Sequence, residues 1–157
     1  MTFVPGEGCA ICAIHADAAG YGDLECHRGR RWIVRHHPLP APLAGWTFLC
    51  SVRHVQGPAD LDDAEAAELG PALRTVSRAV RDLSGCDRVY AIAFGQGAPH
   101  LHVHLAPRFD ADDTTRAWSV ADHYRAVERG DRPAAEPSEV RRFVAAMRSR
   151  LRGTGID

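Results

Sequence analysis

The sequence has no lysine: all 19 of its basic residues are arginine, and 20 acidic residues bring the formal net charge to −1. A chain with so little excess charge lacks the basic surface expected of a protein that binds nucleic acid generically. It also lacks any apolar run of the roughly 18 to 20 residues that a membrane span requires, so we expect no membrane contact. The stretch from Met1 to Cys9 has neither the basic start nor the apolar core of a secretory signal, and we expect a cytoplasmic protein.

Five cysteines form an odd set, which, without a secretory signal, argues against a disulfide framework. Cys9 and Cys12 are separated by two residues, as are pairs of thiolates in structural zinc sites that two further Cys or His ligands complete. His15 continues this spacing and could complete such a site locally. The alternative is that the two cysteines are free and buried. Cys50 falls in an apolar segment and is expected to pack in the core.

A chain of 157 residues is long enough for one domain with a substantial core, and no repeat or long linker divides it. Two short segments rich in β-branched and aromatic residues, 31–35 and 46–52, predict strands joined by a loop that contains proline and glycine. Two more, 88–94 and 100–106, flank a turn and predict an antiparallel hairpin whose second strand ends at Pro107.

Apolar residues at helical spacing predict a long helix between these two pairs of strands. Asp62 and Glu65 have the spacing of a capping box, and Gly85 follows the last apolar position. Pro71 should kink this helix or begin it, because proline removes a backbone donor. Two further helices are predicted at 119–129 and 138–151. The expected fold class is therefore α+β with an antiparallel sheet.

The most informative segment runs from Pro99 to Arg108, where three histidines alternate with aliphatic residues. Because successive side chains of a strand point to opposite faces, the imidazoles of His100, His102 and His104 share one face. The aliphatic residues share the other face, toward the core, which fixes the register. Three adjacent imidazoles repel one another when protonated, so we favour a functional row over a fortuitous run of surface histidines.

The chemistry that suits such a row is transfer of a phosphorus-containing group. A neutral imidazole is nucleophilic near neutral pH, forms a bond to phosphorus and leaves again when water attacks, so it divides one displacement into two. Backbone N–H groups and a cation would stabilise the charge on the phosphate oxygens. Arg108 is the nearest candidate cation in the sequence.

Residues 100–106, His-φ-His-φ-His-φ-φ with φ apolar, resemble the signature of the histidine triad (HIT) superfamily, and Pro107-Arg108 after it is also common there. Upstream segments match the family in order and spacing. Residues 95–100 resemble the Gly-Gln segment that leads into the triad, and residues 45–54 resemble a Gly-His-x-Leu-Val-x-Pro-x-x-His strand. Cys9-x-x-Cys12 resembles the start of zinc-containing bacterial members.

The resemblance implies roles for the residues at matching positions. His102 would be the nucleophile that forms a nucleotidyl-enzyme intermediate, and His104 and Gln96 would contact the phosphate or steer the leaving group. Gly95 and Gly97 would let the backbone come close to the nucleotide.

Fold, metal and assembly also follow from the resemblance. It implies an antiparallel sheet of about five strands with a long helix and C-terminal helices. The family core would cover about residues 1–110, followed by a variable helical extension over about 111–157. It implies a homodimer whose two sheets join, with the helix from about Asp62 to Leu83 at the interface. A structural zinc would be held by Cys9, Cys12, His54 and His100.

The sequence departs from the family pattern at several positions. Trp46 stands where members generally have a histidine that assists the catalytic one; indole donates one hydrogen bond but cannot accept one or shuttle a proton, although it could stack on a base. The family's ribose-binding acid or amide has no clear counterpart in residues 34–38. Gly97 replaces a serine of some branches, which favours cleavage of a polyphosphate over phosphoramidase activity. The remaining histidines, at positions 27, 36, 37 and 123, are expected at the surface without a catalytic role, although His36 and His37 could border the nucleotide pocket.

The leading hypothesis is a nucleotide hydrolase or nucleotidyltransferase that acts at the α-phosphate of a dinucleoside polyphosphate, an adenylylated compound or a nucleoside phosphoramidate. A second hypothesis, motivated by Trp46, is a zinc-stabilised nucleotide-binding module with little turnover. A third is transfer of the nucleotidyl group to phosphate or a sugar phosphate. His104 argues against the third, because uridylyltransferase relatives usually have glutamine at that position.

Overall fold

The computed structural model describes residues 8–16, 22–95 and 97–157. Its strands are β1 Glu25–Arg28, β2 Trp32–His36, β3 Thr47–Ser51, β4 Arg88–Ile92 and β5 His102–Arg108. Its helices are α1 Ala10–Ala16, α2 Asp63–Ser84, α3 Ser119–Glu128 and α4 Pro137–Leu151, with 3₁₀ turns at Gly22–Leu24, Pro58–Asp60 and Asp113–Thr115. The strands form an antiparallel sheet in the order β1-β2-β3-β5-β4. The predicted α+β class and the predicted number of strands are confirmed.

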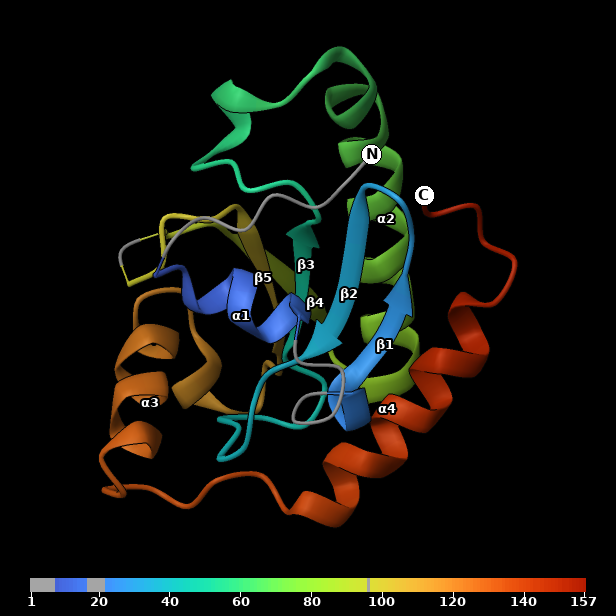
Figure 1. The fold of residues 1–157 in the computed structure, drawn as a ribbon. Coiled ribbons are helices and arrows are strands. Elements are labelled where there is room, and N and C mark those ends of the chain that lie inside the picture. The colour runs from blue at the N-terminus through green and yellow to red at the C-terminus, as the bar shows by residue number, and fades with distance from the viewer. Residues whose placement is uncertain (1–7, 17–21, 96) are drawn as a thin grey trace.

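Helices cover both faces of the sheet: α2 and α4 pack on one face, and α1 and α3 lie on the other (Figure 1). The larger core lies under α2 and α4 and includes Val103 and Leu105 of β5. A second core contains Trp46 and Phe48 together with side chains of α3. Consecutive side chains of one strand therefore pack in two different cores, because they point to opposite faces of the sheet. Among the described helices, none has both the length and the apolar character needed to cross a bilayer.

Helix α2 begins and ends where its capping residues predict. The carboxylate of Asp62 accepts a hydrogen bond from the backbone N–H of Glu65 at 2.8 Å, and the carboxylate of Glu65 accepts one from the backbone N–H of Asp62 at 2.9 Å. Gly85 ends the helix with a φ of 68°, a left-handed conformation that glycine adopts without strain. The helix does not begin at Pro71, as one alternative predicted, but runs through it.

The histidine-bearing strand is shifted by two residues from the prediction. β5 runs from His102 to Arg108, so His100 precedes it and Pro107 lies within it. Pairing between β3 and β5 stops at Thr47 and Leu105, and only β4 pairs with β5 at Pro107. Proline is tolerated there because the ladder on one side has already ended.

The surface placement expected for His36 and His37 is wrong. Their exposed fractions are 0% and 6%. Nδ1–H of His36 donates to the carbonyl of His37 at 2.9 Å, while Nε2 accepts the backbone N–H of Gly45 at 2.8 Å. Gly45 has a φ of +93°, and a Cβ there would lie 3.1 Å from the Phe143 ring. The buried imidazole thus fixes the turn that leads into β3.

Candidate functional site

Two of the three triad histidines lie side by side on the face of the sheet that α1 and α3 cover. His102 pairs with Cys50 across the sheet, and His104 pairs with Phe48. The centroids of the two imidazoles are 5.2 Å apart. His102 is partly exposed, whereas 8% of His104 is exposed. The alternation therefore places these histidines as predicted from the pleat, with the middle one open to solvent.

His100 lies just before the strand and has a different environment. It is fully buried, and its Nε2 is 2.8 Å from the carbonyl oxygen of Ser51. A carbonyl can only accept, so Nε2 carries the proton and Nδ1 keeps a lone pair. That lone pair points toward two thiols: Nδ1 lies 3.6 Å from Sγ of Cys9 and 3.4 Å from Sγ of Cys12.

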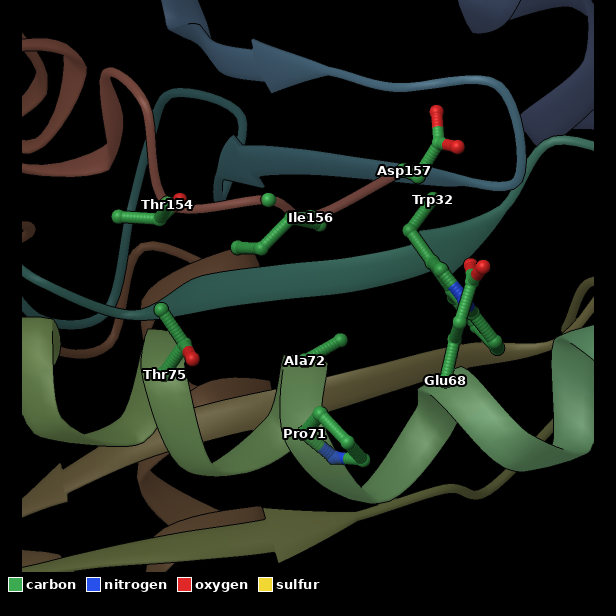
Figure 2. Close-up of a pocket in the computed structure, with 9 residues that line it drawn as sticks. Trp32, Glu68, Pro71, Ala72, Thr75, Thr154, Ile156 and Asp157 are labelled. Carbon is green, nitrogen blue, oxygen red and sulfur yellow. The ribbon is translucent and has the colours of Figure 1, made fainter.

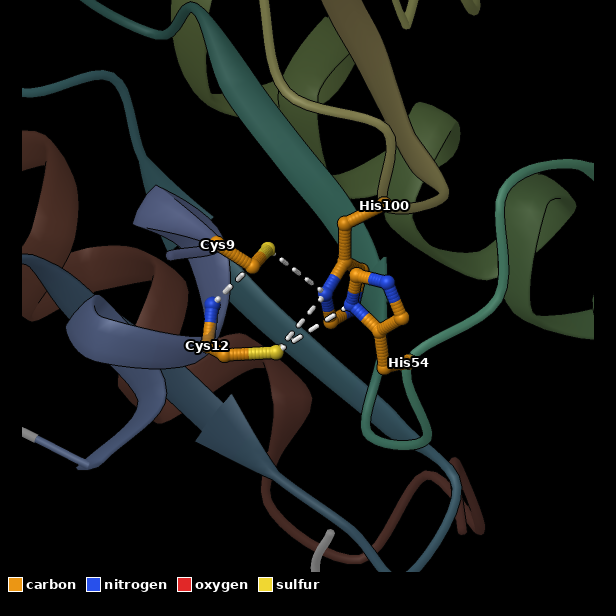
Figure 3. A group of neighbouring side chains, drawn as sticks. All are labelled: Cys9, Cys12, His54 and His100. Atoms are coloured by element: carbon orange, nitrogen blue, oxygen red, sulfur yellow. Dashed lines mark hydrogen bonds between the residues drawn. The ribbon is translucent and has the colours of Figure 1, made fainter. Parts of the chain in front are cut away.

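His54 completes a group of four candidate ligands, shown in Figure 3. Its Nδ1 lies 3.3 Å from Sγ of Cys12, and the four ligand atoms all lie within 4.8 Å of one another. Tetrahedral zinc, with bonds of about 2.3 Å to sulfur and about 2.0 Å to nitrogen, separates a sulfur from a nitrogen ligand by about 3.6 Å. The measured separations fit that value. The hydrogen bond from His100 to Ser51 is the kind of outer contact that orients a metal-binding imidazole.

His15, the alternative local ligand, lies beside this group rather than in it. Its ring meets that of His100 edge to face, with centroids 5.1 Å apart. Burial, followed by the charge of Arg35, lowers the pKa of His15 to about 3, so the ring is neutral. The described geometry therefore favours His54 over His15 as a ligand.

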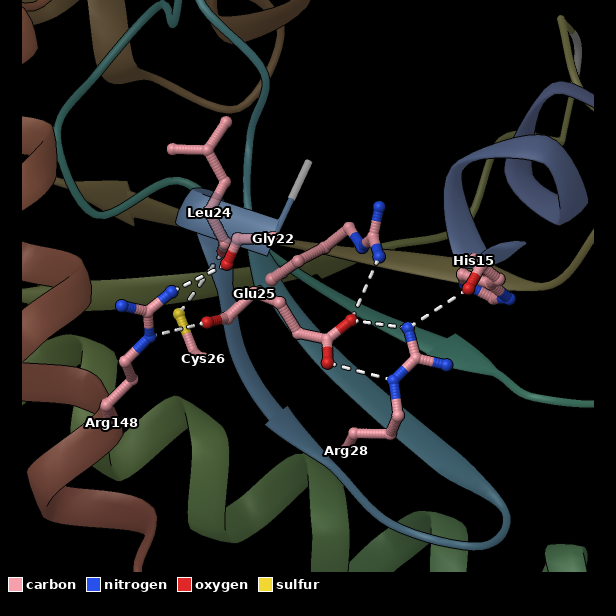
Figure 4. A network of polar contacts seen from close by, with 8 residues as sticks. His15, Gly22, Leu24, Glu25, Cys26, Arg28 and Arg148 are labelled. Carbon is pink, nitrogen blue, oxygen red and sulfur yellow. Dashed lines mark hydrogen bonds and ion pairs between the residues drawn. The ribbon is translucent and has the colours of Figure 1, made fainter. Parts of the chain in front are cut away.

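Helix α1, which carries the two thiols, is tied to the sheet by the polar network of Figure 4. Arg28 of β1 donates to both carboxylate oxygens of Glu25, at 2.9 and 2.6 Å, and to the backbone carbonyl of His15 at 3.2 Å. Glu25 also pairs with the buried Arg35 at 3.3 Å. The network joins the C-terminal end of α1 to β1 and β2.

The hydrogen bond made by His102 determines which of its nitrogens can react. Nδ1 lies 2.6 Å from the backbone carbonyl oxygen of His100. Nδ1 must therefore carry a proton, and in the neutral ring the lone pair is then on Nε2. The free nitrogen belongs to the most exposed imidazole of the row, which is the arrangement that a nucleophile needs.

In His104, Nδ1 accepts a hydrogen bond, whereas in His102 it donates one. The indole N–H of Trp46 donates to Nδ1 of His104 at 3.2 Å. Burial, followed by the charges of His102 and His37, lowers the pKa of His104 to about 3, so the ring is neutral at neutral pH. Trp46 itself is 2% exposed, which leaves no open face of the indole on which a nucleotide base could stack. The family resemblance placed position 46 beside the catalytic histidines, but nothing in the sequence indicated that Trp46 would bond His104 in particular.

The segment before the triad is described in part. Gln96 lies outside the described residues. Gly95 has a φ of +63°, which favours glycine, and a Cβ at either Gly95 or Gly97 would meet no atom within 4 Å. Phe94, which the sequence reasoning did not single out, is 58% exposed, and its ring centroid lies 5.7 Å from that of His104. Its only signal in the sequence was an aromatic residue directly before a glycine turn.

Arg108 does not lie near His102. It lies six residues along β5 from His102, a separation of roughly 20 Å at the usual rise of a strand. Its guanidinium pairs with Asp110 at 3.2 Å and donates to Oγ1 of Thr115 at 3.4 Å. The structure therefore does not bring Arg108 close to His102, because residues that are neighbours in a short motif can lie far apart along an extended strand.

Two hollows in the molecule lie away from the histidine row. One, of about 50 Å³, lies between α2 and the C-terminal segment and is lined by Trp32, Pro71 and Ala72 among others (Figure 2). Pockets for small molecules are typically about 300 Å³ or more, so this one is too small for a nucleotide. The other, of about 450 Å³, is lined by residues of α3, by residues that precede this helix, and by Arg129 and Arg132. Neither hollow is lined by a triad histidine.

The fold and the site together define an α+β protein with a histidine row on one sheet face and a Cys₂His₂ cluster beside it. No family model matches the chain, and no curated protein matches it significantly. Solved structures do match, and histidine triad proteins are among them.

Three of these structures illustrate the match. A histidine triad protein from Bradyrhizobium japonicum is 26% identical, with a TM-score of 0.63 over 82% of this chain and 90% of that one. A zinc-bound histidine triad family protein from Mycobacterium smegmatis is 17% identical, with a TM-score of 0.68 over 92% and 96%. A hypothetical histidine triad nucleotide-binding protein from Sulfolobus tokodaii is 19% identical, with a TM-score of 0.64 over 90% and 91%. The chain has the histidine triad fold, and the resemblance drawn from its motifs is confirmed.

Proposed function

We propose that this chain is a nucleotide hydrolase or nucleotidyltransferase that acts at the α-phosphate of a small nucleotide through a nucleotidyl-histidine intermediate on His102. The observation that carries the proposal is the hydrogen bond from Nδ1–H of His102 to the carbonyl of His100, because it leaves Nε2 with a lone pair on the exposed side of the row. The histidine triad fold and the description of the Sulfolobus tokodaii neighbour as nucleotide-binding support the same conclusion.

The reaction takes place in two displacements. In the first, the Nε2 lone pair of His102 forms a bond to the α-phosphorus while the bond from phosphorus to the leaving group breaks, and the leaving group departs with that electron pair. The imidazole becomes positively charged, and its Nδ1–H becomes a stronger donor to the carbonyl of His100. In the second, a water oxygen bonds to phosphorus and releases a proton to the solvent, the P–N bond breaks, and its electron pair returns to Nε2. If phosphate or a sugar phosphate replaces the water, the same steps transfer the nucleotidyl group.

We also propose that Cys9, Cys12, His54 and His100 hold a structural zinc ion. The protein would supply all four ligands of the tetrahedral ion, so no position would be open for substrate. The ion would therefore make the site rigid and would not act as a Lewis acid. The ligand separations fit tetrahedral zinc, and the Mycobacterium smegmatis neighbour is zinc-bound.

We further propose a homodimer in which the sheet continues across the interface. β4 is an edge strand of the sheet, and an unpaired edge presents backbone groups that a second copy can pair with. Light scattering after size-exclusion chromatography measures the mass of the species directly, and a monomer at all concentrations would contradict this assembly.

The catalytic proposal is tested by trapping the intermediate. Wild-type protein is incubated with nucleotides labelled at the α-phosphate, such as dinucleoside polyphosphates, adenylylated compounds and nucleoside phosphoramidates, and the label on the protein is measured after rapid denaturation. We expect labelling of the wild type and none of His102→Ala. His27→Gln is the matched control, because His27 lies on β1 and bonds only the carbonyl of Ile156 among the described residues. A wild type that no such nucleotide labels would refute the proposal.

A second candidate function is a nucleotide-binding module with little turnover. The observation that favours it is Trp46, which cannot accept or pass on a proton at the position beside His104. Calorimetry with AMP distinguishes the two: binding without hydrolysis of any substrate in the set above would favour the module.

A further inference from the structure

In the hydrogen bond between Trp46 and His104, only Trp46 can be the donor. The nitrogen atoms are 3.2 Å apart, and an indole N–H is a donor without a lone pair to accept. Nδ1 of His104 is therefore the acceptor, and the single proton of the neutral ring is on Nε2. Because 2% of Trp46 and 8% of His104 are exposed, water competes little for this bond.

Aromatic rings hold both partners in place. The ring centroids of Phe48 and Phe94 lie 4.6 and 5.7 Å from that of His104, both edge to face. Tyr124 packs on the indole, with centroids 5.8 Å apart. A flip of the His104 ring would place a carbon atom against the indole N–H and leave that buried donor unpaired, which is costly. The tautomer and the rotamer of His104 are thus fixed together.

We propose that Trp46 is a positioning residue that locks His104 as the Nε2–H tautomer, so that His104 acts as a permanent neutral hydrogen-bond donor to the phosphate attacked by His102. This inference rests on the proposed function. Among the described residues, none forms a hydrogen bond with Nε2 of His104, so this N–H is available to a ligand. The adjacent ring of His102 has the reverse tautomer, and the pair presents a lone pair next to a donor.

Nε2–H of His104 is a permanent donor because residue 46 is a tryptophan and not a histidine. A histidine there, which the family resemblance predicts, could donate to Nδ1 of His104 or accept from it, and so would allow both tautomers of His104. Tryptophan allows only the tautomer of His104 that has its proton on Nε2. Since the ring of His104 also remains neutral because of its burial, it donates a hydrogen bond to a phosphate oxygen without giving up its proton.

The first test is a direct measurement of the tautomer. In imidazole-¹⁵N-labelled protein, two-bond ¹H–¹⁵N correlations distinguish protonated from unprotonated ring nitrogens, and His104→Gln identifies the signals by their loss. We expect an unprotonated Nδ1 and a protonated Nε2 in the wild type, and a mixture of tautomers in Trp46→Phe. Trp32→Phe is the matched control: Trp32 is equally buried but lies in the other core, and its loss should leave the tautomer unchanged.

The second test is kinetic. We expect Trp46→Phe to slow nucleotidylation of His102 by about three- to tenfold, which corresponds to the net free energy of one hydrogen bond. The Kd for AMP should change little. Trp32→Phe should change neither the rate nor the Kd. If Trp46→Phe does not fold, replacement of Trp46 by benzothienylalanine keeps the shape of the ring and substitutes sulfur for the N–H. A proton on Nδ1 in the wild type, or a rate that neither replacement alters, would overturn the inference alone. Absence of any wild-type adduct would overturn the proposed function instead.

Discussion

His36 makes the stability of this protein depend on pH in a defined range. The residue is fully buried, and both ring nitrogens have partners that require the neutral form: Nδ1 donates to His37, and Nε2 accepts from the backbone of Gly45. A second proton on Nε2 would oppose the Gly45 N–H. Burial is the main cause that lowers the pKa of His36 to about 4.

The size of the effect follows from the difference between the folded and unfolded pKa. The unfolded value is 6.5 and the folded value about 4, so the unfolded state binds more protons between these limits. The stabilising contribution is therefore complete above pH 6.5 and is lost as the pH falls toward 4. Each unit of difference corresponds to about 1.4 kcal/mol, which gives a total loss of about 3 kcal/mol, of which about 2 kcal/mol is lost by about pH 5.

The assay is urea unfolding of wild type and His36→Gln at about pH 7.5 and about pH 5, followed by circular dichroism. Glutamine is less stabilising at the higher pH because it fills the site less well, but it does not titrate. We expect the loss of stability between the two pH values to be smaller by about 2 kcal/mol in His36→Gln. Other titrating groups, including the Cys and His cluster, are present in both proteins and cancel. Equal losses in the two proteins would show that His36 is not the group responsible.

Two further predictions concern the metal cluster and the cap of α2. Metal analysis of the purified protein should find about one zinc per chain, and both a chelator and Cys12→Ser should lower the unfolding temperature; an unfolding temperature that chelation does not change would contradict the structural role. Glu65 is 3% exposed, caps the Asp62 N–H and pairs with Arg53 at 2.6 Å, so Glu65→Ala should cost about 2 kcal/mol in urea unfolding. Glu65→Gln, which keeps an acceptor for the cap, should cost less, and equal costs would mean that the cap contributes nothing.

The sequence predicted those parts of the fold that depend on local patterns. The capping box at Asp62 and Glu65 and the glycine at position 85 set the ends of α2 to within a residue, because each acts on backbone groups of the same turn. The alternation of histidines with Val103 and Leu105 predicted which side chains face the core, because the pleat of a strand requires it. Motif order then predicted the histidine triad fold.

Features that depend on contacts between distant segments were not predictable in the same way. β1 is four residues long and mostly polar, and α1 is seven residues long, so neither carries enough periodicity to be recognised. The burial of His36 results from a turn nine residues away that supplies Gly45. Arg108 follows the triad in sequence, yet an extended strand carries it away from His102.

The hydrogen-bond partners that distinguish the triad histidines are equally invisible in the sequence. Two of them are backbone carbonyls, of Ser51 and of His100, and every residue has a carbonyl. Periodicity indicates that the imidazoles share a face, but it does not indicate which ring nitrogen is protonated. That choice depends on whether the nearest group accepts or donates.

His100 contacts both the other candidate zinc ligands and His102. Its side chain is fixed at both nitrogens, by the carbonyl of Ser51 and by the thiols of Cys9 and Cys12, while its own carbonyl accepts the proton of His102 Nδ1. A rigid side chain restricts the backbone to which it is attached, so an ion in the cluster would also hold the carbonyl that selects the tautomer of His102. A metal with no contact to substrate would in this way favour a lone pair on Nε2 of His102, the atom that we propose as the nucleophile.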